Sequence, residues 1–227
     1  LHLCDRRQRQ MCIRDSNKAS SNAQDGISAI QTAEGALNEA HSILQRMNEL
    51  ATQSANDTNT TADRTAVQSE VNALTNELSR IASTSQFNTQ NLLDGTFTGK
   101  NLQVGALENQ KITISIGTMN AEALGVDSLD VKSFTKAGSA MTLIQKAISK
   151  VSGQRSDLGA LQNRLEHTVN NLDNISENTQ TAESRIRDTD MASEMVQYSA
   201  TSIIQQAGQS MLAQANSQTQ GVLSLIQ

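Results

Sequence analysis

The chain has no proline in 227 residues, and this absence constrains its fold more than any other feature. Proline inside a helix removes a backbone hydrogen bond and clashes with the preceding turn, so a chain without it can run in long, unbroken helices. Aromatic residues make up only 2% of the chain, and tryptophan is absent. Because large rings normally fill the centre of a compact domain, this composition favours thin, elongated packing of helices.

Apolar side chains recur at alternating steps of three and four residues, which is typical of seams between long helices. The first such segment begins at about Asn17. Thr60 and Asp63 form a capping-box pattern that predicts the start of a second helix, folded back on the first as an antiparallel hairpin. A third rod helix is predicted over residues 139–185. The residues predicted to pack this rod are Ile30, Leu37, Leu44, Leu74, Leu78, Leu158, Leu165 and Leu172.

Between Phe87 and Phe134 the apolar period changes to two. The alternating segments 102–104 and 112–116, with glycines around them, predict a small β-hairpin. Since so few strands are not stable alone, we expect the hairpin to lean on the helices. The predicted fold is mainly α: an elongated antiparallel helical rod with a small β-hairpin insert and a long carboxy-terminal helix.

The last segment, residues 186–227, is predicted to be a weakly amphipathic helix rich in glutamine and serine. Nothing else in the sequence obviously covers it. An isolated helix depends on partners more than on propensity, so we expect this one to fray in the monomer. The residues predicted to pack against its partners are Val196, Ile203, Leu212, Val222, Leu223 and Ile226.

The first sixteen residues differ from the rest. They lack apolar periodicity and contain both cysteines and four arginines. We interpret residues 1–16 as a non-native segment. The expected division is then 17–95 for the amino-terminal rod helices and a turn, 96–138 for a short β-rich insert, 139–185 for the carboxy-terminal rod helix and 186–227 for the last helix.

No pattern of catalytic or ligand-binding residues is present. His2, His41 and His167 are far apart, and neither a zinc-binding spacing nor a glycine-rich phosphate loop occurs. The net charge of -5 argues against nucleic-acid binding, and no apolar run is long enough to span a membrane. We therefore predict a non-enzymatic protein without cofactor or metal.

Four stretches resemble bacterial flagellin, and they occur in the order found in that family. They are NAQDGISAIQTAEGALNEAHSILQRMNELATQSAND at 22–57, QFNTQNLLDG at 86–95, LGALQNRLEHTVNNL at 158–172, and ESRIRDTDMASEMV with QQAGQSMLAQAN between 183 and 216. The resemblance implies an inner rod domain built from both halves of the chain. It also implies a separate coiled coil of both chain ends in the filament core, to which the last helix would belong.

The function implied by this resemblance is a structural subunit of the extracellular flagellar filament, exported by the flagellar secretion system and polymerising for motility. The implied partners are other flagellin subunits, an export chaperone, the filament cap protein and the flagellin-sensing Toll-like receptor of vertebrates. Arg46, Leu50 and Glu70 match positions of receptor contact. Family members carry a further helix before the position of Asn17, so we expect an amino-terminal truncation that impairs assembly.

Two other functions remain open from the sequence. A hook–filament junction protein shares the end domains of flagellin. A chemoreceptor-like signalling hairpin is also alanine-rich and acidic, although the β insert argues against it. An enzyme inserted within residues 96–138 is disfavoured because no zinc motif or nucleophile elbow occurs there.

Overall fold

The computed structural model describes the backbone of residues 2–188 and 190–226, and the side chains of residues 8, 10–185, 188 and 190–218. The chain divides after Gln180 into two compact units. The first unit holds three long helices, and the second consists of the end of one helix, a short joint and the last helix. Among the described residues, none of the helices combines the length and hydropathy needed to cross a lipid bilayer.

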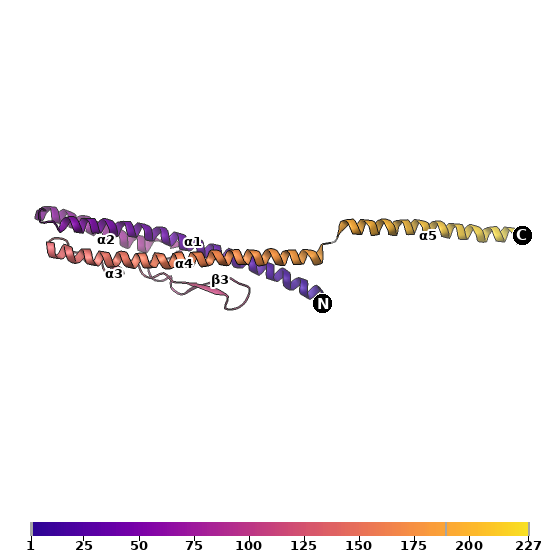
Figure 1. Cartoon of the computed structure of the whole chain (residues 1–227), viewed down its shortest axis with the longest axis horizontal. Coiled ribbons are helices and arrows are strands. Elements are labelled where there is room, and N and C mark those ends of the chain that lie inside the picture. The colour runs from indigo at the N-terminus through magenta and orange to yellow at the C-terminus, as the bar shows by residue number, and fades with distance from the viewer. Residues whose placement is uncertain (1, 189, 227) are drawn as a thin grey trace. The chain divides into compact units, whose positions relative to one another are not determined.

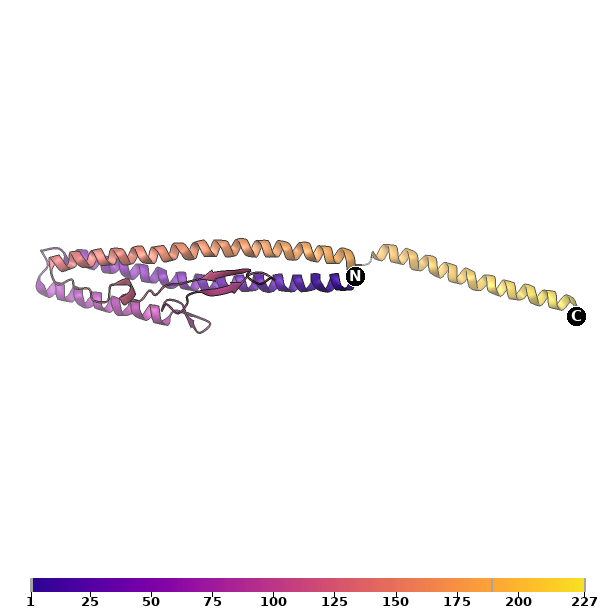
Figure 2. The same cartoon turned by 90° about the horizontal axis from the view of Figure 1, so that it is seen from below.

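Three helices run side by side in the first unit, namely α1 (His2–Ser54), α2 (Thr61–Thr84) and α4 (Phe134–Arg187) (Figures 1 and 2). We call this bundle, up to Gln180, the rod. Helix α2 folds back antiparallel on α1, and α4 lies along α1 (Figure 2). Arg155 of α4 reaches Glu34 of α1, with nitrogen and oxygen 3.7 Å apart. The predicted antiparallel helical rod is confirmed.

The buried seam of α1 begins before Ile30, the first of the residues predicted to pack the rod. Ser20 Oγ donates a hydrogen bond to Asp173 Oδ1 at 3.0 Å, and Ser176 Oγ donates one to Asn17 Oδ1 at 2.7 Å. These bonds join α1 to the late part of α4. A search for large apolar residues misses this stretch because its seam is made of small ones. Its buried residues are Ser16, Ala19, Ser20 and Ala23.

Helix α2 starts with the predicted capping box. The backbone N–H of Asp63 donates to Thr60 Oγ1 at 3.3 Å, and the backbone N–H of Thr60 donates to Asp63 Oδ2 at 2.9 Å. The Thr60 hydroxyl also donates to Asp63 Oδ2 at 2.7 Å. These bonds from the Thr60 side chain and backbone hold the pKa of the Asp63 carboxyl below its ordinary value. The cap therefore satisfies helix-end donors that would otherwise lack partners.

Replacing Thr60 with alanine is expected to lower the free energy of unfolding by about 0.5–2 kcal/mol at neutral pH, since a capping hydroxyl is lost. Because the folded pKa of Asp63 is depressed, the carboxylate's share of this cap is present above the unfolded pKa, near 4, and is lost as pH falls through the folded value. Urea unfolding of both proteins between about pH 7 and 3 measures this. A difference that does not shrink in acid would contradict the ionised cap.

Two short hairpins follow α2. Strands β1 (Gln86–Phe87) and β2 (Gln90–Asn91) pair across a two-residue turn. Strands β3 (Lys100–Gln103) and β4 (Lys111–Ile114) form the larger antiparallel hairpin, in which Leu102 lies opposite Ile112. The predicted β-hairpin is confirmed.

The larger hairpin packs against α1 at Gly26. A Cβ atom at this position would lie 2.2 Å from Cδ1 of Leu102 and 3.5 Å from Cδ1 of Leu165. Asn22, one turn earlier, donates from Nδ2 to the carbonyl oxygen of Gln103 at 3.1 Å. The missing side chain of Gly26 thus lets β3 approach the helix closely, which explains how so small a sheet is supported.

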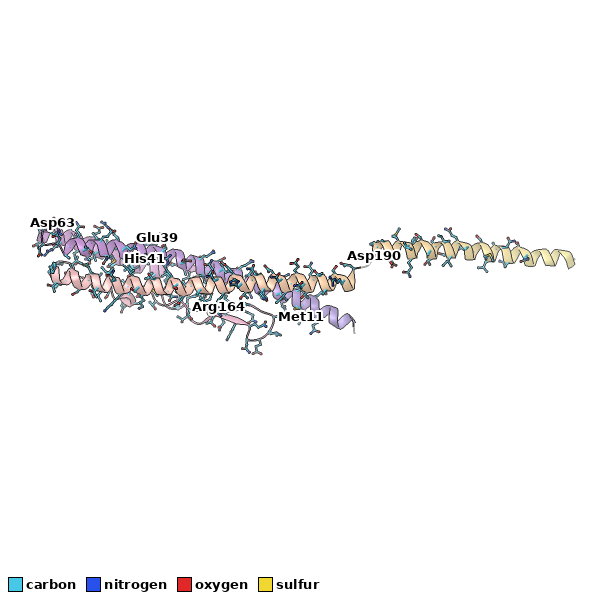
Figure 3. All side chains as sticks on the ribbon, viewed as in Figure 1. Met11, Glu39, His41, Asp63, Arg164 and Asp190 are labelled. Carbon is cyan, nitrogen blue, oxygen red and sulfur yellow. The ribbon has the colours of Figure 1, made fainter. Side chains whose placement is uncertain are left out.

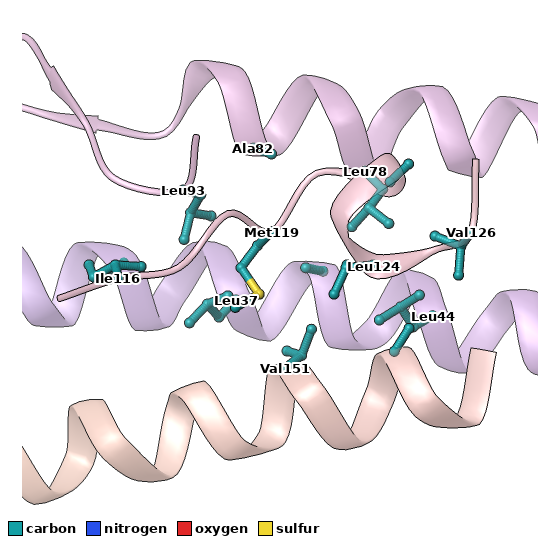
Figure 4. Close-up of a cluster of buried hydrophobic side chains, with 14 of the residues drawn as sticks. Leu37, Leu44, Leu78, Ala82, Leu93, Ile116, Met119, Leu124, Val126 and Val151 are labelled. Carbon is teal, nitrogen blue, oxygen red and sulfur yellow. The ribbon is translucent and has the colours of Figure 1, made fainter. Parts of the chain in front are cut away.

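The chain then returns along the helices through the short helix α3 (Ala121–Leu124). Asn120 caps it, and Gly125 ends it with a φ of 74°, a left-handed conformation that suits glycine. In Figure 4 Met119 is directed toward Leu37 of α1, while Val151 of α4 faces α1 from the other side. The returning segment thereby completes the core between the helices.

The residues chosen from the sequence for rod packing lie in or beside this core. Leu172 is 7% exposed, and Leu74 is half-buried against the cluster. Six others are fully buried, namely Ile30, Leu37, Leu44, Leu78, Leu158 and Leu165.

Two helix starts are set by side-chain caps. Helix α4 begins at Phe134 rather than near Ser139, because Ser133 Oγ accepts a hydrogen bond from the backbone N–H of Lys136 at 3.4 Å. Helix α5 (Met191–Ile226) begins after Asp190, whose Oδ1 accepts from the backbone N–H of Ala192 at 3.0 Å. The predicted long carboxy-terminal helix is confirmed.

Candidate assembly surface

Helix α5 exposes most of its large apolar side chains. Val196 is 71% exposed, Ile203 is 66% exposed and Ile204 is 72% exposed. The rod, by contrast, buries its own leucines and isoleucines almost completely. Contiguous apolar surface of this kind marks a protein or membrane contact. The further exposed apolar side chains of the helix are Met191, Met195, Tyr198, Met211 and Leu212.

Five of the residues on α5 form one stripe. Val196, Ala200, Ile203, Ala207 and Met211 follow one another by steps of four, three, four and four, which keeps them on one side of the helix. We call them the α5 stripe. The two alanines leave room for a second helix to approach closely. The stripe therefore has the form of a helix–helix seam without its partner.

No charged residue or histidine occurs between Met195 and Gln227. A contact made by this part of α5 can gain nothing from ion pairs, so burial of apolar surface and side-chain hydrogen bonds must drive it. Such a contact should depend little on salt or pH. The absence of charge can be read from the sequence. It is the signal that could have identified Ile204 and Tyr198, which were not among the residues predicted to pack against partners.

The residues predicted for filament-core packing are placed as follows. Val196 and Ile203 lie on the α5 stripe. Leu212 is 66% exposed but lies nine positions after Ile203, about 180° around the helix at roughly 100° per residue. The side chains of Val222, Leu223 and Ile226 lie outside the described ones. One partner helix cannot cover both Ile203 and Leu212.

The predicted receptor contacts lie between α1 and α2. Arg46 donates from Nε and Nη2 to Glu70 Oε1 at 3.0 and 2.8 Å, and from Nη1 to Glu49 Oε2 at 3.2 Å. The hydrogen bond to Glu70, followed by that to Glu49, raises the pKa of Arg46. Leu50, the third residue that matches a receptor-contact position, is only 2% exposed and belongs to the core.

No arrangement suited to catalysis is found in the described part of the chain. Among the described residues, no group of three or more His, Cys, Asp or Glu side chains could hold a metal ion. His41, labelled in Figure 3, makes a hydrogen bond of 3.0 Å through Nε2 with Nε2 of Gln45 on the same helix. Its position on a helix surface matches an ordinary polar role.

Comparison with known protein families agrees with the helical organisation. The amino-terminal helical region of bacterial flagellin matches residues 7–98, and the carboxy-terminal helical region of bacterial flagellin matches residues 141–226. The two matches bracket the β3–β4 hairpin and include all of α2 and α5 and most of α1 and α4. The match also begins within the segment 1–16.

Individual flagellins are similar over nearly the whole chain. Flagellin of Halalkalibacterium halodurans is 53% identical over 216 residues, which cover 94% of this chain and 79% of that protein. Flagellin of Bacillus subtilis is 45% identical and is covered to 82%. The crystal structure of Bacillus cereus flagellin is 32% identical with a TM-score of 0.59, covering 67% of this chain and 88% of that one.

These relatives favour a filament subunit over a junction protein or a signalling hairpin, since their identity extends through the rod helices, the hairpin region and α5. Assembly of such structural proteins into a filament also explains why the α5 stripe is exposed to water in a single chain. The chain belongs to the bacterial flagellin family, whose members are the structural subunits of the flagellar filament.

Proposed function

We propose that the chain joins the filament through two parts with different tasks. Residues 17–185 comprise most of the rod and the end of α4, and this part is stable by itself because the rod buries its own apolar side chains. Residues 186–227 supply the filament-core helix, which packs against helices of neighbouring subunits. The observation that carries this proposal is the exposure of Val196, Ile203 and Met211 along one stripe.

The energetics indicate why one neighbour is not enough. Burying a large apolar side chain contributes about 1.5–3 kcal/mol, so Val196, Ile203 and Met211 together contribute about 5–9 kcal/mol. Bringing two molecules together costs roughly 4–15 kcal/mol in lost freedom. A single helix pair is therefore marginal. Neighbours on both sides of α5, covering Leu212 as well as the stripe, would make the assembly stable and cooperative.

The other proposed partners follow from the same surfaces. An export chaperone would cover the apolar face of α5 before assembly, and the cap protein would hold the subunit at the growing end. Passage through the flagellar secretion system as an unfolded chain suits a rod of mostly local helical contacts, because such folds form quickly. We propose that the exposed ion pair of Arg46 and Glu70 contacts the vertebrate receptor and that the buried Leu50 does not.

Hydrogen exchange tests the proposal on the full chain. In the monomer, amides of residues 191–226 are expected to exchange fast, whereas those of the rod from Ile30 to Leu172 are protected. In polymers grown on filament seeds, residues 191–226 are expected to gain protection while the rod changes little. Equal protection of α5 and the rod in the monomer, or no gain on polymerisation, would contradict the proposal.

A further inference from the structure

The six methionines that follow the segment 1–16 fall into two groups of different exposure. In the rod, Met47 and Met119 are buried, and Met141 is half-buried against the core. Figure 4 shows Met119 directed toward Leu37, inside the cluster. On α5 the side chains are between 57% and 70% exposed, and these methionines are Met191, Met195 and Met211. Water therefore reaches the thioether sulfurs of α5 far more readily than those of the rod.

A thioether sulfur that water reaches can also be reached by dissolved oxidants. A hydroperoxide transfers one oxygen atom to this sulfur. The O–O bond of the peroxide breaks, a sulfur–oxygen bond forms, and the peroxide leaves as water or an alcohol. The sulfur is thereby oxidised by two electrons and the peroxide is reduced. Because the oxidant arrives from the solvent, the methionines of α5 are expected to react before those of the rod.

Met211 differs from the other two methionines of α5 in its place around the helix. It is the last residue of the α5 stripe, one turn after Ala207. Met191 and Met195 lie about 140° and 100° around the helix from Val196, at roughly 100° per residue. A neighbouring helix that covers the α5 stripe must therefore bury the sulfur of Met211.

Oxidation of Met211 changes the chemistry of the α5 stripe. A sulfoxide is strongly polar, whereas the thioether that it replaces packs as an apolar group. Its oxygen is hydrogen-bonded to water in the free chain, and it loses this water when a helix covers it. No lysine, arginine or histidine follows Arg187, so α5 offers the sulfoxide no cationic donor. The oxidised stripe is consequently a poor helix seam.

We propose that Met211 is a reversible oxidation site that decides whether α5 can assemble. This inference rests on the proposed function, since it presupposes that neighbouring helices cover the α5 stripe. In the free subunit, a hydroperoxide oxidises Met211 and thereby keeps the subunit out of the filament. Two thiols reverse the change on a methionine sulfoxide reductase, which returns the thioether and releases a disulfide and water.

Oxidation of the monomer before assembly tests the site. The test chain carries Met11→Leu, Met191→Leu and Met195→Leu, which leaves Met211 as its one strongly exposed methionine. The monomer is treated with hydrogen peroxide, the excess is removed with catalase, and the chain is offered to filament seeds. Incorporation, measured by pelleting, is expected to fall by about tenfold or more relative to the untreated sample of the same chain.

The matched control adds Met211→Leu to the test chain. Leucine is an apolar side chain of similar volume without the sulfur. Peroxide is expected to leave incorporation of this control equal to that of its own untreated sample. In the test chain, peptide mass spectrometry should find the added oxygen on Met211 and not on Met47 or Met119. Methionine sulfoxide reductases for both sulfoxide epimers, supplied with dithiothreitol, should restore incorporation.

Three outcomes separate this inference from the proposed function. Full incorporation of a chain with sulfoxide at Met211, or an equal loss in the Met211→Leu control, overturns the oxidation site and leaves the proposed function standing. Failure of the reductases to restore incorporation overturns its reversibility in the same way. An unsubstituted, untreated chain that does not incorporate on seeds overturns both.

Discussion

Replacing Leu37 with alanine is expected to lower the free energy of unfolding of the rod by about 2–5 kcal/mol. Leu37 is fully buried in α1, and Met119 packs over it from the returning segment (Figure 4). The substitution removes apolar contacts and leaves a cavity. The surrounding helices are held by their other contacts, so they can move to fill this cavity only in part. Since a domain of this size is stable by about 5–15 kcal/mol, the change is a large fraction of the total.

Urea unfolding followed by circular dichroism measures this loss. Leu143→Ala is the matched control, because it removes the same atoms from a side chain that is 41% exposed on α4. The control is expected to cost well under half as much as Leu37→Ala. Similar losses from the two substitutions would show that Leu37 is not part of a closely packed core.

The second large effect is expected from Ile203→Asp in the α5 stripe. A carboxylate placed in an apolar helix seam must lose its water without gaining a charged partner, since no basic residue follows Met195. The penalty is several kcal/mol for each buried ion. Incorporation into polymers on filament seeds should fall by about a hundredfold or more, while urea unfolding of the rod stays unchanged.

Ile203→Asn provides the control for this charge. Asparagine has nearly the shape of aspartate but carries no charge, so it separates the loss of apolar contact from the cost of burying an ion. Pelleting of polymers, followed by quantification of the soluble subunit, compares the two variants. If Ile203→Asn blocked assembly as strongly as Ile203→Asp, burial of a charge in the stripe would not be the cause.

Much of the rod could be predicted because its signals are local. Thr60 and Asp63 cap α2 as their spacing indicates, and the alternation around Leu102 and Ile112 marks paired strands. The prediction of the buried seam was incomplete, however, because it left out Ser16 and Ser20, which are buried. Their burial depends on Asp173 and its neighbours, which lie more than 150 positions later in the chain.

Leu50 shows the limit of helical spacing as a guide to exposure. Its separation of four from Arg46 indicates neighbouring positions on one helix, but α1 is covered by α2, α4 and the returning segment, and this covering buries Leu50 while Arg46 stays exposed. Spacing locates a residue around its own helix. It does not tell which side another element will cover.

The sequence by itself determined the long helices, the hairpin and the uncharged last helix, because each depends on residues within a few turns of one another. Only the tertiary structure decided that Gly26 admits Leu102 and that Ser20 of α1 meets Asp173 of α4. These features join segments far apart in the chain. Their physical cause is the packing of whole elements, which local propensity does not contain.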